Sequence, residues 1–240
     1  MLKNYLIVTL RRLTRSRGHT FLNILGLTIG MACAMLIGLY INDELSYDRH
    51  HERADRIYRV VSGHSARTSG PLAPLVLAQV PGVEQAVRIR TTVGSWLFAV
   101  DDVRFYERRV YWADQSLFDI FNVPLVQGNP ATALSAPYTI IISESMARKY
   151  FGNTDPIGRV IDADNGFLNL TVTAVIEDPQ EYAHFHPDFF ISVATMEARI
   201  VPGSPFNIDN WLNSNFYTYF LLSPASSPDL VTQKLRERLD

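Results

Sequence analysis

The sequence predicts an α+β protein with one N-terminal transmembrane helix, followed by an extracytoplasmic domain of mixed strands and helices in two subdomains. Residues 20–42 contain no charged side chain, which indicates the membrane helix. Short β-branched or alternating runs follow and indicate strands. Helical segments lie among these runs without the regular alternation of a parallel doubly wound sheet, so α+β is the predicted class.

The first segment, residues 1–19, is predicted to be a cytoplasmic amphipathic helix. Leu2, Leu6, Leu10 and Leu13 recur at helical spacing and form one apolar stripe. A basic amphipathic helix directly before a membrane span is expected to lie in the headgroup layer. Five basic residues accompany the stripe: Lys3, Arg11, Arg12, Arg15 and Arg17. Composition alone favours a simple membrane anchor, and the alternative is a docking surface for a cytoplasmic partner.

The second segment, residues 20–42, has the length of one bilayer crossing. Its apolar part, residues 21–41, forms a helix of roughly 32 Å at about 1.5 Å per residue, against about 30 Å of hydrocarbon. A cleaved signal peptide is the alternative, because Ala32-Cys33-Ala34 resembles a cleavage site. Cleavage there would leave an exposed apolar N-terminus, so a membrane anchor is the preferred interpretation.

Charge gives this span a direction. Five of the 22 basic residues and none of the 24 acidic residues precede Asp43. Basic residues near a span favour the cytoplasm, so we expect a cytoplasmic N-terminus and a periplasmic or extracellular domain, residues 43–240, on a bacterial inner membrane. The domain is net negative, which argues against nucleic acid as a partner. The single cysteine, Cys33, lies in the span, so the domain has no internal disulfide.

The span also carries a face of small residues. Gly26 and Gly30 form a GxxxG pattern, and Ala34 and Gly38 continue the spacing of four. Small residues on one helical face let another helix approach closely. We therefore expect these four residues to pack against a protein helix as well as lipid.

The first half of the domain shows alternating strand patterns separated by short helices. Pro71 suits a first helical turn, and Pro81-Gly82 ends that helix. Residues 122–130 (NVPLVQGNP) are predicted to form turns. Strands are predicted at 56–61, 83–92 and 95–100, a hairpin at 103–113, and helices at 71–80 and 116–121.

The second half begins with a continuous β-branched run at 138–142, typical of a buried strand. Ser143 is expected to cap a helix that continues to about 151 and stops at Gly152-Asn153. Asn165-Gly166 predicts a type I′ turn between strands. The remaining predicted elements are strands at 159–162, 168–176, 189–193 and 216–222, and a helix at 228–239.

Catalytic and cofactor motifs are missing from the sequence. Neither GxxxxGK[ST] nor a GxGxxG after a strand occurs, and GxSxG is absent. His184-x-His186 near Asp188 would need a further ligand to hold a metal, so polar loop histidines are the preferred interpretation. We therefore predict no catalytic residues, no cofactor and no metal site, and no enzymatic activity for this chain.

Three blocks of sequence resemble a known family. FLNILGLTIGMACAMLIGLYINDELSYDRHHERADRIYRV (21–60) closely resembles the first membrane helix and domain start of bacterial ABC transporter permeases of the FtsX-like type with a MacB-like periplasmic core domain. SESMARKYFGNTDPIGRVI (143–161) is similar to the family's FGxxDPIGK-type turn, with Arg159 where lysine is common. LTVTAVIEDP (170–179) resembles a VxGVxxDxP segment, with Ala174 in place of glycine.

The resemblance implies a permease subunit, or its N-terminal part, of an ABC-type exporter. A separate cytoplasmic ABC ATPase would hydrolyse ATP and move the periplasmic domain. A second permease copy or paralogue, a periplasmic adaptor and the lipid bilayer are the other implied partners. Such permeases have three more membrane helices after the domain, so we expect a fragment or truncated form. The alternative is a single-span sensory or scaffolding domain without transport, and the substrate is left open.

Overall fold

The computed structural model describes residues 15, 17–46, 53–179, 185–199 and 207–239. It contains two units, residues 1–47 and 48–240, each considered separately below. In the first, helix α2 (Arg17–Ser46) is one continuous helix of 30 residues. Residues 17–41 of α2 are long and apolar enough to cross a membrane. The predicted amphipathic helix at 2–15 lies, apart from Arg15, outside the described residues.

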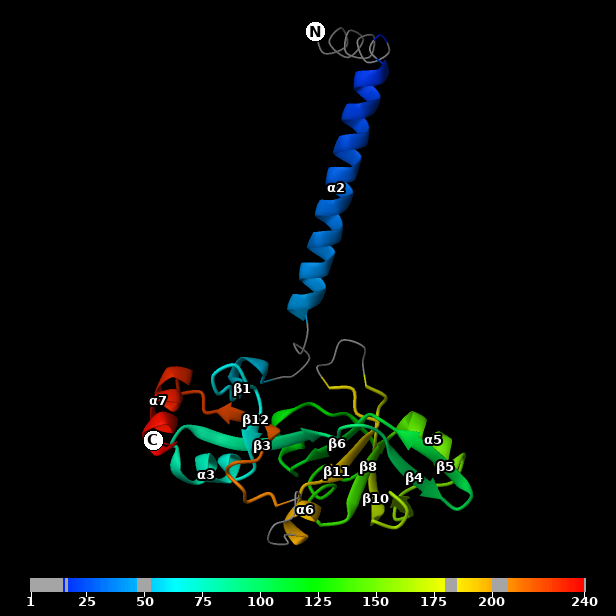
Figure 1. Cartoon of the computed structure of the whole chain (residues 1–240), viewed down its shortest axis with the longest axis vertical. Helices are drawn as coiled ribbons and strands as arrows, with labels where there is room; N and C mark the ends of the chain where they lie inside the picture. The colour runs from blue at the N-terminus through cyan, green and yellow to red at the C-terminus, as the bar shows by residue number, and fades with distance from the viewer. Residues whose placement is uncertain (1–14, 16, 47–52, 180–184, 200–206, 240) are drawn as a thin grey trace. The chain divides into compact units, whose positions relative to one another are not determined.

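The second unit is built on one twelve-stranded mixed sheet (Figure 1). Its order is β1-β12-β3-β6-β11-β8-β10-β9-β4-β5, with β2 beside β12 and β7 beside β10. The strands are β1 (Ile57–Arg59), β2 (Thr68–Ser69), β3 (Val83–Thr91), β4 (Trp96–Val100), β5 (Val103–Glu107), β6 (Val110–Ala113), β7 (Leu125–Gly128), β8 (Thr139–Ser143), β9 (Val160–Ala163), β10 (Leu168–Ile176), β11 (Phe189–Ser192) and β12 (Ser214–Leu222).

Short helices connect these strands. Helix α3 precedes β3, and Figure 1 shows it beside α7 and β1 at one end of the sheet, whereas α5 lies at the other end. The helices are η1 (Ala54–Arg56), α3 (Leu72–Gln79), α4 (Leu117–Ile120), α5 (Glu144–Phe151), α6 (Ala194–Ala198) and α7 (Pro228–Leu239). Mixed pairing with few β-α-β repeats confirms the predicted α+β class.

Local turn chemistry confirms two of the predicted connections. Ser143 caps α5, and its hydroxyl accepts a hydrogen bond from the Met146 N–H. Strands β9 and β10 pair as an antiparallel hairpin. Asp164, Asn165 and Gly166 all have positive φ in the turn between them, a conformation that Asn, Asp and Gly tolerate best.

The predicted hairpin at 103–113 is wrong. β5 pairs with β4 across Asp101-Asp102, and β6 leaves to pair with β3 and β11. Asp101 has φ +51, so the tight turn forms one strand earlier than expected. Both segments do form strands, but alternation alone does not tell which strands pair, because every half-buried strand shows it.

Besides the two-residue strand β2, two elements were not anticipated. Residues 125–128, predicted as turns, form the edge strand β7 against the end of β10. Helix α6 spans only five residues and follows β11 directly. Both are shorter than the windows in which periodicity is measurable, so their sequences carried no usable signal.

Three apolar clusters form the core of the domain. One lies under α5 and contains Phe98, Phe189 and Ile191. The second lies on the opposite face of the sheet, around Ile89, Ile141 and Leu221. The third lies under α3 and α7: Leu72, Ala73, Val76, Val80, Ala86, Phe220, Leu222 and Val231. All three clusters pack on the same continuous sheet, and the division into two subdomains stays a prediction.

Candidate functional site: a membrane span and a motif-bearing corner

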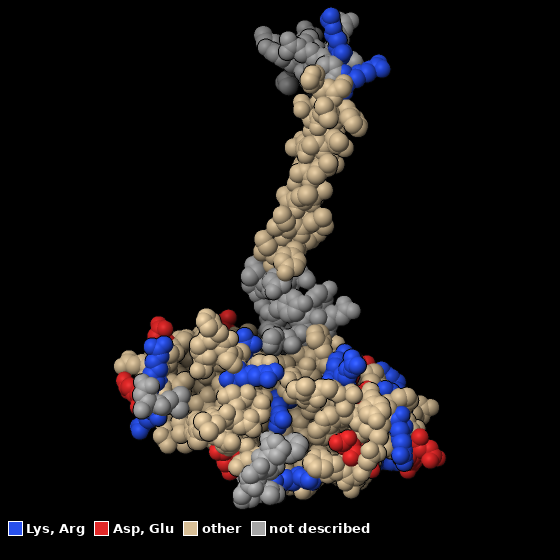
Figure 2. Space-filling view, viewed as in Figure 1, with Lys and Arg blue, Asp and Glu red and all other residues tan. Residues whose placement is uncertain are grey.

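The small residues of the span lie on exposed helix surface. A Cβ added to Gly26, Gly30 or Gly38 would meet nothing within 4 Å. In Figure 2, the part of α2 that would cross a membrane shows an uncharged surface on the visible face, and blue basic atoms gather at its N-terminal end. Arg15 and Arg17 are exposed at that end, whereas Lys3, Arg11 and Arg12 lie outside the described residues.

Enlarging the small face is expected to weaken helix association within the membrane. Gly30→Leu should reduce self- or partner association of the span about tenfold, since close backbone approach is lost. Ala32→Leu is the matched control, because residue 32 lies on a different face of α2 and adds a similar volume. An association assay in membranes checks this prediction, and equal effects of the two substitutions would contradict it.

Two of the family-like blocks meet at one corner of the domain. Asp178, at the end of the IEDP segment, accepts a hydrogen bond from the Ser145 N–H at 2.8 Å, in the first turn of α5. Its other oxygen accepts from Arg148 of the same helix at 3.2 Å. The acid of one block therefore caps the helix of the other, although the two are 33 residues apart in the chain.

The turn after α5 is held by its own polar groups. The Thr154 hydroxyl donates to the Phe151 carbonyl at 2.6 Å, and Asp155 accepts from the Ile157 N–H at 3.0 Å. Gly158, with φ +78, donates to the Val172 carbonyl of β10. The DPIG sequence thus fixes where the chain re-enters the sheet, which is a structural role.

A shallow depression of about 340 Å³ lies at this corner. Its floor is Val175 of β10, and α5 and the edge strand β7 form its sides. The lining residues are Val126, Gln127, Glu144, Ala147, Arg148, Gly152, Asn153, Thr154, Asp155, Pro156 and Val175. Most of these side chains are polar and exposed, so the surface is open and contains no catalytic constellation in the described residues.

The capping acid gives a pH-dependent prediction. Burial acts to raise the pKa of Asp178, but hydrogen bonds from Ser145 and Ser143 and the charge of Arg148 outweigh it and lower the pKa below its ordinary value. Its contribution to stability is therefore present above the ordinary Asp pKa of about 3.9 and is lost as pH falls through the lower, folded-state value.

Asp178→Asn is accordingly expected to lower the free energy of unfolding by about 1 kcal/mol at pH 7, within the range of capping interactions. The difference from the wild type should disappear in acid, where Asp178 is protonated. Thermal unfolding between pH 2.5 and 7 measures this, with exposed Asp102→Asn as the control. A constant difference at all pH values would show that Asp178 acts through packing instead of charge.

Next to this corner lies a partly buried group of charges. Glu107 at the end of β5 accepts hydrogen bonds from Lys149 at 2.7 Å and from the Tyr150 hydroxyl at 2.8 Å. Burial, together with the hydrogen bond to Glu107, raises the pKa of the Tyr150 phenol. These contacts hold α5 against the β4–β5 hairpin. The raised pKa keeps the Tyr150 phenol protonated.

Asp188, which follows the His184-x-His186 pair in the sequence, lies in the interior of the domain. Arg109 donates to one of its oxygens at 2.8 Å. Its other oxygen has no hydrogen-bond partner among the described residues. Burial raises the pKa of Asp188, and the charge of Arg109 opposes this shift. Within the described part of the chain, no group of His, Cys, Asp or Glu has the arrangement of a metal site, and His184 lies outside it.

Arg88 on β3 carries a buried charge, and the residue is 8% exposed. Its guanidinium forms a two-pronged ion pair with Asp114, at 2.9 and 2.7 Å. It also donates to Glu197 of α6 at 2.7 Å and to the Gly70 carbonyl at 3.2 Å. Burial acts to lower the pKa of Arg88, but the two acids outweigh burial and raise it, so the guanidinium stays charged.

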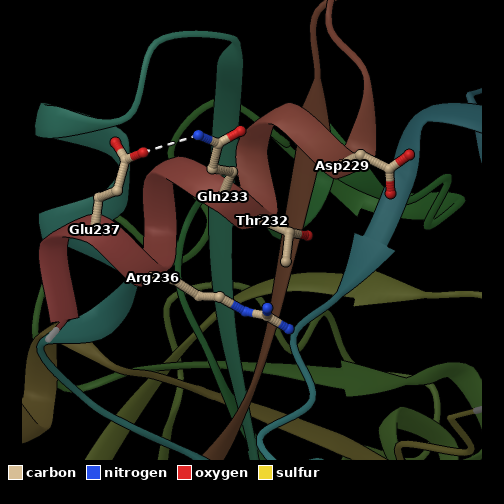
Figure 3. A pocket seen from close by; sticks show the side chains of 5 residues that line it. All are labelled: Asp229, Thr232, Gln233, Arg236 and Glu237. Atoms are coloured by element: carbon tan, nitrogen blue, oxygen red, sulfur yellow. Dashed lines mark hydrogen bonds between the residues drawn. The ribbon is translucent and has the colours of Figure 1, made fainter.

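A second depression, of about 390 Å³, lies along one side of α7. Figure 3 shows Asp229, Thr232, Gln233, Arg236 and Glu237 projecting from this single helix, with a hydrogen bond from Gln233 to Glu237 at 2.9 Å. All five polar side chains belong to one solvated helix face. This surface therefore offers no convergent binding geometry.

Together, these features define an α+β domain that follows an apolar helix long enough to cross a membrane, and whose buried charges hold its elements in place. The chain belongs to the family of MacB-like periplasmic core domains, whose family model matches residues 20–238. The permease resemblance seen in the sequence is thereby confirmed. A comparison with curated proteins gave no match.

Two solved structures are similar to this chain. A domain from Porphyromonas gingivalis, assigned as part of a permease, has TM-score 0.66 and 27% identity, and the alignment covers 78% of this chain and 84% of that one. The periplasmic region of MacB from Actinobacillus actinomycetemcomitans has TM-score 0.55 and 16% identity, covering 76% and 80% respectively, and shares the fold.

Proposed function

We propose that this chain is a permease subunit, or the N-terminal portion of one, in an ABC-type exporter. ATP hydrolysis by a separate cytoplasmic ATPase would move its extracytoplasmic domain. The observation that carries this proposal is the family match from residue 20 to 238, which includes the apolar span and the domain in one unit of sequence. A domain of an ABC-type permease needs such an attachment to receive movement from the membrane.

The form of α2 supports this role. The helix continues without interruption from Arg17 to Ser46, beyond the apolar part that ends at Ile41. At about 1.5 Å per residue it is a rod of roughly 45 Å, whose internal hydrogen bonds resist bending. A displacement at its N-terminal end would thus be passed along the whole span.

The basic residues before the span are the proposed contact with the ATPase. In this orientation the N-terminus is cytoplasmic and the domain lies on the periplasmic side of the inner membrane, in agreement with the positive-inside rule. The small face of Gly26, Gly30, Ala34 and Gly38 is proposed to contact a second permease copy or paralogue. A periplasmic adaptor is a further proposed partner.

Co-purification tests this function. The full-length protein is expressed with a candidate ABC ATPase from the same genome, extracted in mild detergent and captured through a tag on the permease. We expect the ATPase to be retained, and to be lost when Arg15 and Arg17 are both changed to Glu. Failure of the wild-type protein to retain any ATPase would instead favour a single-span sensory or scaffolding protein.

A further inference from the structure

The core of the domain is divided on one face of the sheet and continuous on the other. Alternate residues of a strand point to opposite faces. On one face of β12, Phe216 belongs to the cluster under α5 and Phe220 to the cluster under α3 and α7, with Thr218 between them. On the opposite face, Tyr219 and Leu221 belong to a single cluster.

The division continues into β3. Ala86 packs in the cluster under α3 and α7, and Arg88, two residues further along the same face, is charged and buried. Thr218, beside Arg88 in the register, is fully buried and its hydroxyl lies 2.6 Å from that of Thr68. A belt of polar side chains therefore separates the two apolar clusters on this face.

The ladder between β3 and β6 lies at the same place. β3 pairs with β12 through six residue pairs and with β6 through three, at Ile89, Arg90 and Thr91. Backbone hydrogen bonds from Thr92 to Val110 and from Asp114 to Arg88 extend this ladder at its two ends. This short ladder, called the seam here, joins β1, β2, β12 and β3 to the remaining strands. Figure 1 shows β1, β12, α3 and α7 on one side of it and β8, β10, β4 and β5 on the other.

Arg88 crosses the seam with two contacts of unequal strength. Asp114, directly after β6, accepts the Arg88 guanidinium twice and the Arg88 N–H once, and its own N–H donates to the Arg88 carbonyl. Glu197 accepts a single hydrogen bond from Arg88, and its side chain is 49% exposed against 19% for Asp114. Water can replace the Glu197 contact at low cost but not the Asp114 contact.

We propose that the domain bends at the β3–β6 seam and that the Arg88–Glu197 ion pair is the latch that holds it closed. The continuous apolar cluster around Ile89 and Leu221 keeps the two sides together as the fulcrum. On the opposite face the polar belt can open at Glu197, whose half-exposed side chain can exchange its hydrogen bond with Arg88 for water. Asp114 stays bound to Arg88 in both arrangements.

This inference deepens the proposed function, because it locates the movement that an exporter domain would undergo. The biological purpose of this bending rests on the proposed function, but the experiment that tests the bending does not need that function. The chain alone in lipid nanodiscs, without an ATPase, is sufficient for the measurement. Failure to retain an ATPase would contradict the proposed function, whereas failure of the seam to open would contradict the latch. The two failures are therefore distinguishable.

The experiment opens the latch with Glu197→Gln and reads local hydrogen exchange. We expect the amides of Met196 and Glu197 in α6, and of Arg199 directly after it, to exchange about two- to fivefold faster, the range for loss of a half-exposed ion pair. Amides of α5 should keep their wild-type rates. Glu84→Gln is the matched control, since Glu84 forms one comparable exposed pair with Arg56 at 3.2 Å, away from the seam.

A distance measurement completes the test. Spin labels are attached at Thr232→Cys on α7 and Tyr106→Cys on β5, in a Cys33→Ala background. They measure the distance between the two sides of the seam. Glu197→Gln should broaden the distance distribution, whereas Glu84→Gln should leave it unchanged. An unchanged distribution, or exchange that accelerates equally in α5 and α6, would overturn the latch.

Discussion

Replacing Arg88 with alanine is expected to lower the free energy of unfolding of the domain by about 3–5 kcal/mol. The guanidinium is buried and links β3 to Asp114, to Glu197 and to the Gly70 carbonyl. Its removal leaves the Asp114 carboxylate, mostly buried, without its cation. The Gly70 carbonyl loses a donor at the same time, and unpaired buried acceptors are costly.

Thermal or denaturant unfolding of the purified protein measures this effect. For a domain of this size, the expected loss corresponds to a fall of roughly 6–20 °C in Tm. Arg148→Ala is the control, because Arg148 is exposed and its pairs with Glu144 and Asp178 are surface interactions worth under about 1 kcal/mol. Similar losses for the two variants would show that burial of Arg88 is unimportant.

The loss at Arg88 should be reduced when its partners are removed with it. Arg88→Met with Asp114→Asn removes the uncompensated charge and fills part of the volume with apolar atoms. Buried ion pairs replaced as a unit are often nearly neutral, so the double variant is expected to be more stable than Arg88→Met alone. A double-mutant cycle across these two residues gives their coupling energy.

Gly128→Ala is expected to destabilise the domain by about 3–5 kcal/mol, because strain and overpacking add. Gly128 has φ +100, a conformation that residues with a Cβ rarely adopt. An added Cβ would lie 2.6 Å from the Thr173 carbonyl oxygen and 2.8 Å from the Ala174 Cα. These are backbone atoms of β10, which cannot move without breaking its pairing with β7.

Gly94→Ala separates the two causes. Gly94 has φ +83, but a Cβ there would meet nothing within 4 Å. This control should cost only about 1 kcal/mol, the strain of the backbone conformation alone. Unfolding midpoints in urea compare the variants, and equal losses at Gly94 and Gly128 would mean that the close approach of β7 to β10 is not limiting.

The sequence predicted well wherever the signal was local. The span follows from the absence of charge over about twenty residues, and α2 contains it. The Ser143 cap and the turn at Asp164, Asn165 and Gly166 follow from side-chain chemistry within a few residues. The motif-bearing blocks identify the family from the sequence alone, and the family model confirms it.

Pairing and burial of polar groups could not be predicted in this way. The 103–113 segment alternates like a hairpin, yet its strands pair with β4 on one side and with β3 and β11 on the other. Asp178 was visible as part of a motif, but its role as a cap of α5 depends on β8 and β10 lying side by side. Alternation reports only that a strand is half-buried.

By itself, the sequence determined that the chain has an apolar stretch long enough to cross a membrane, an α+β domain and the motifs of a permease family. The tertiary structure decided which strands meet, that β7 needs Gly128, and that Arg88 joins Asp114 and Glu197. Arg88 and Glu197 are 109 residues apart, so no local periodicity relates them. Their contact exists because the sheet order places β3 beside β6 and because α6 packs against the same face, a consequence of the whole fold.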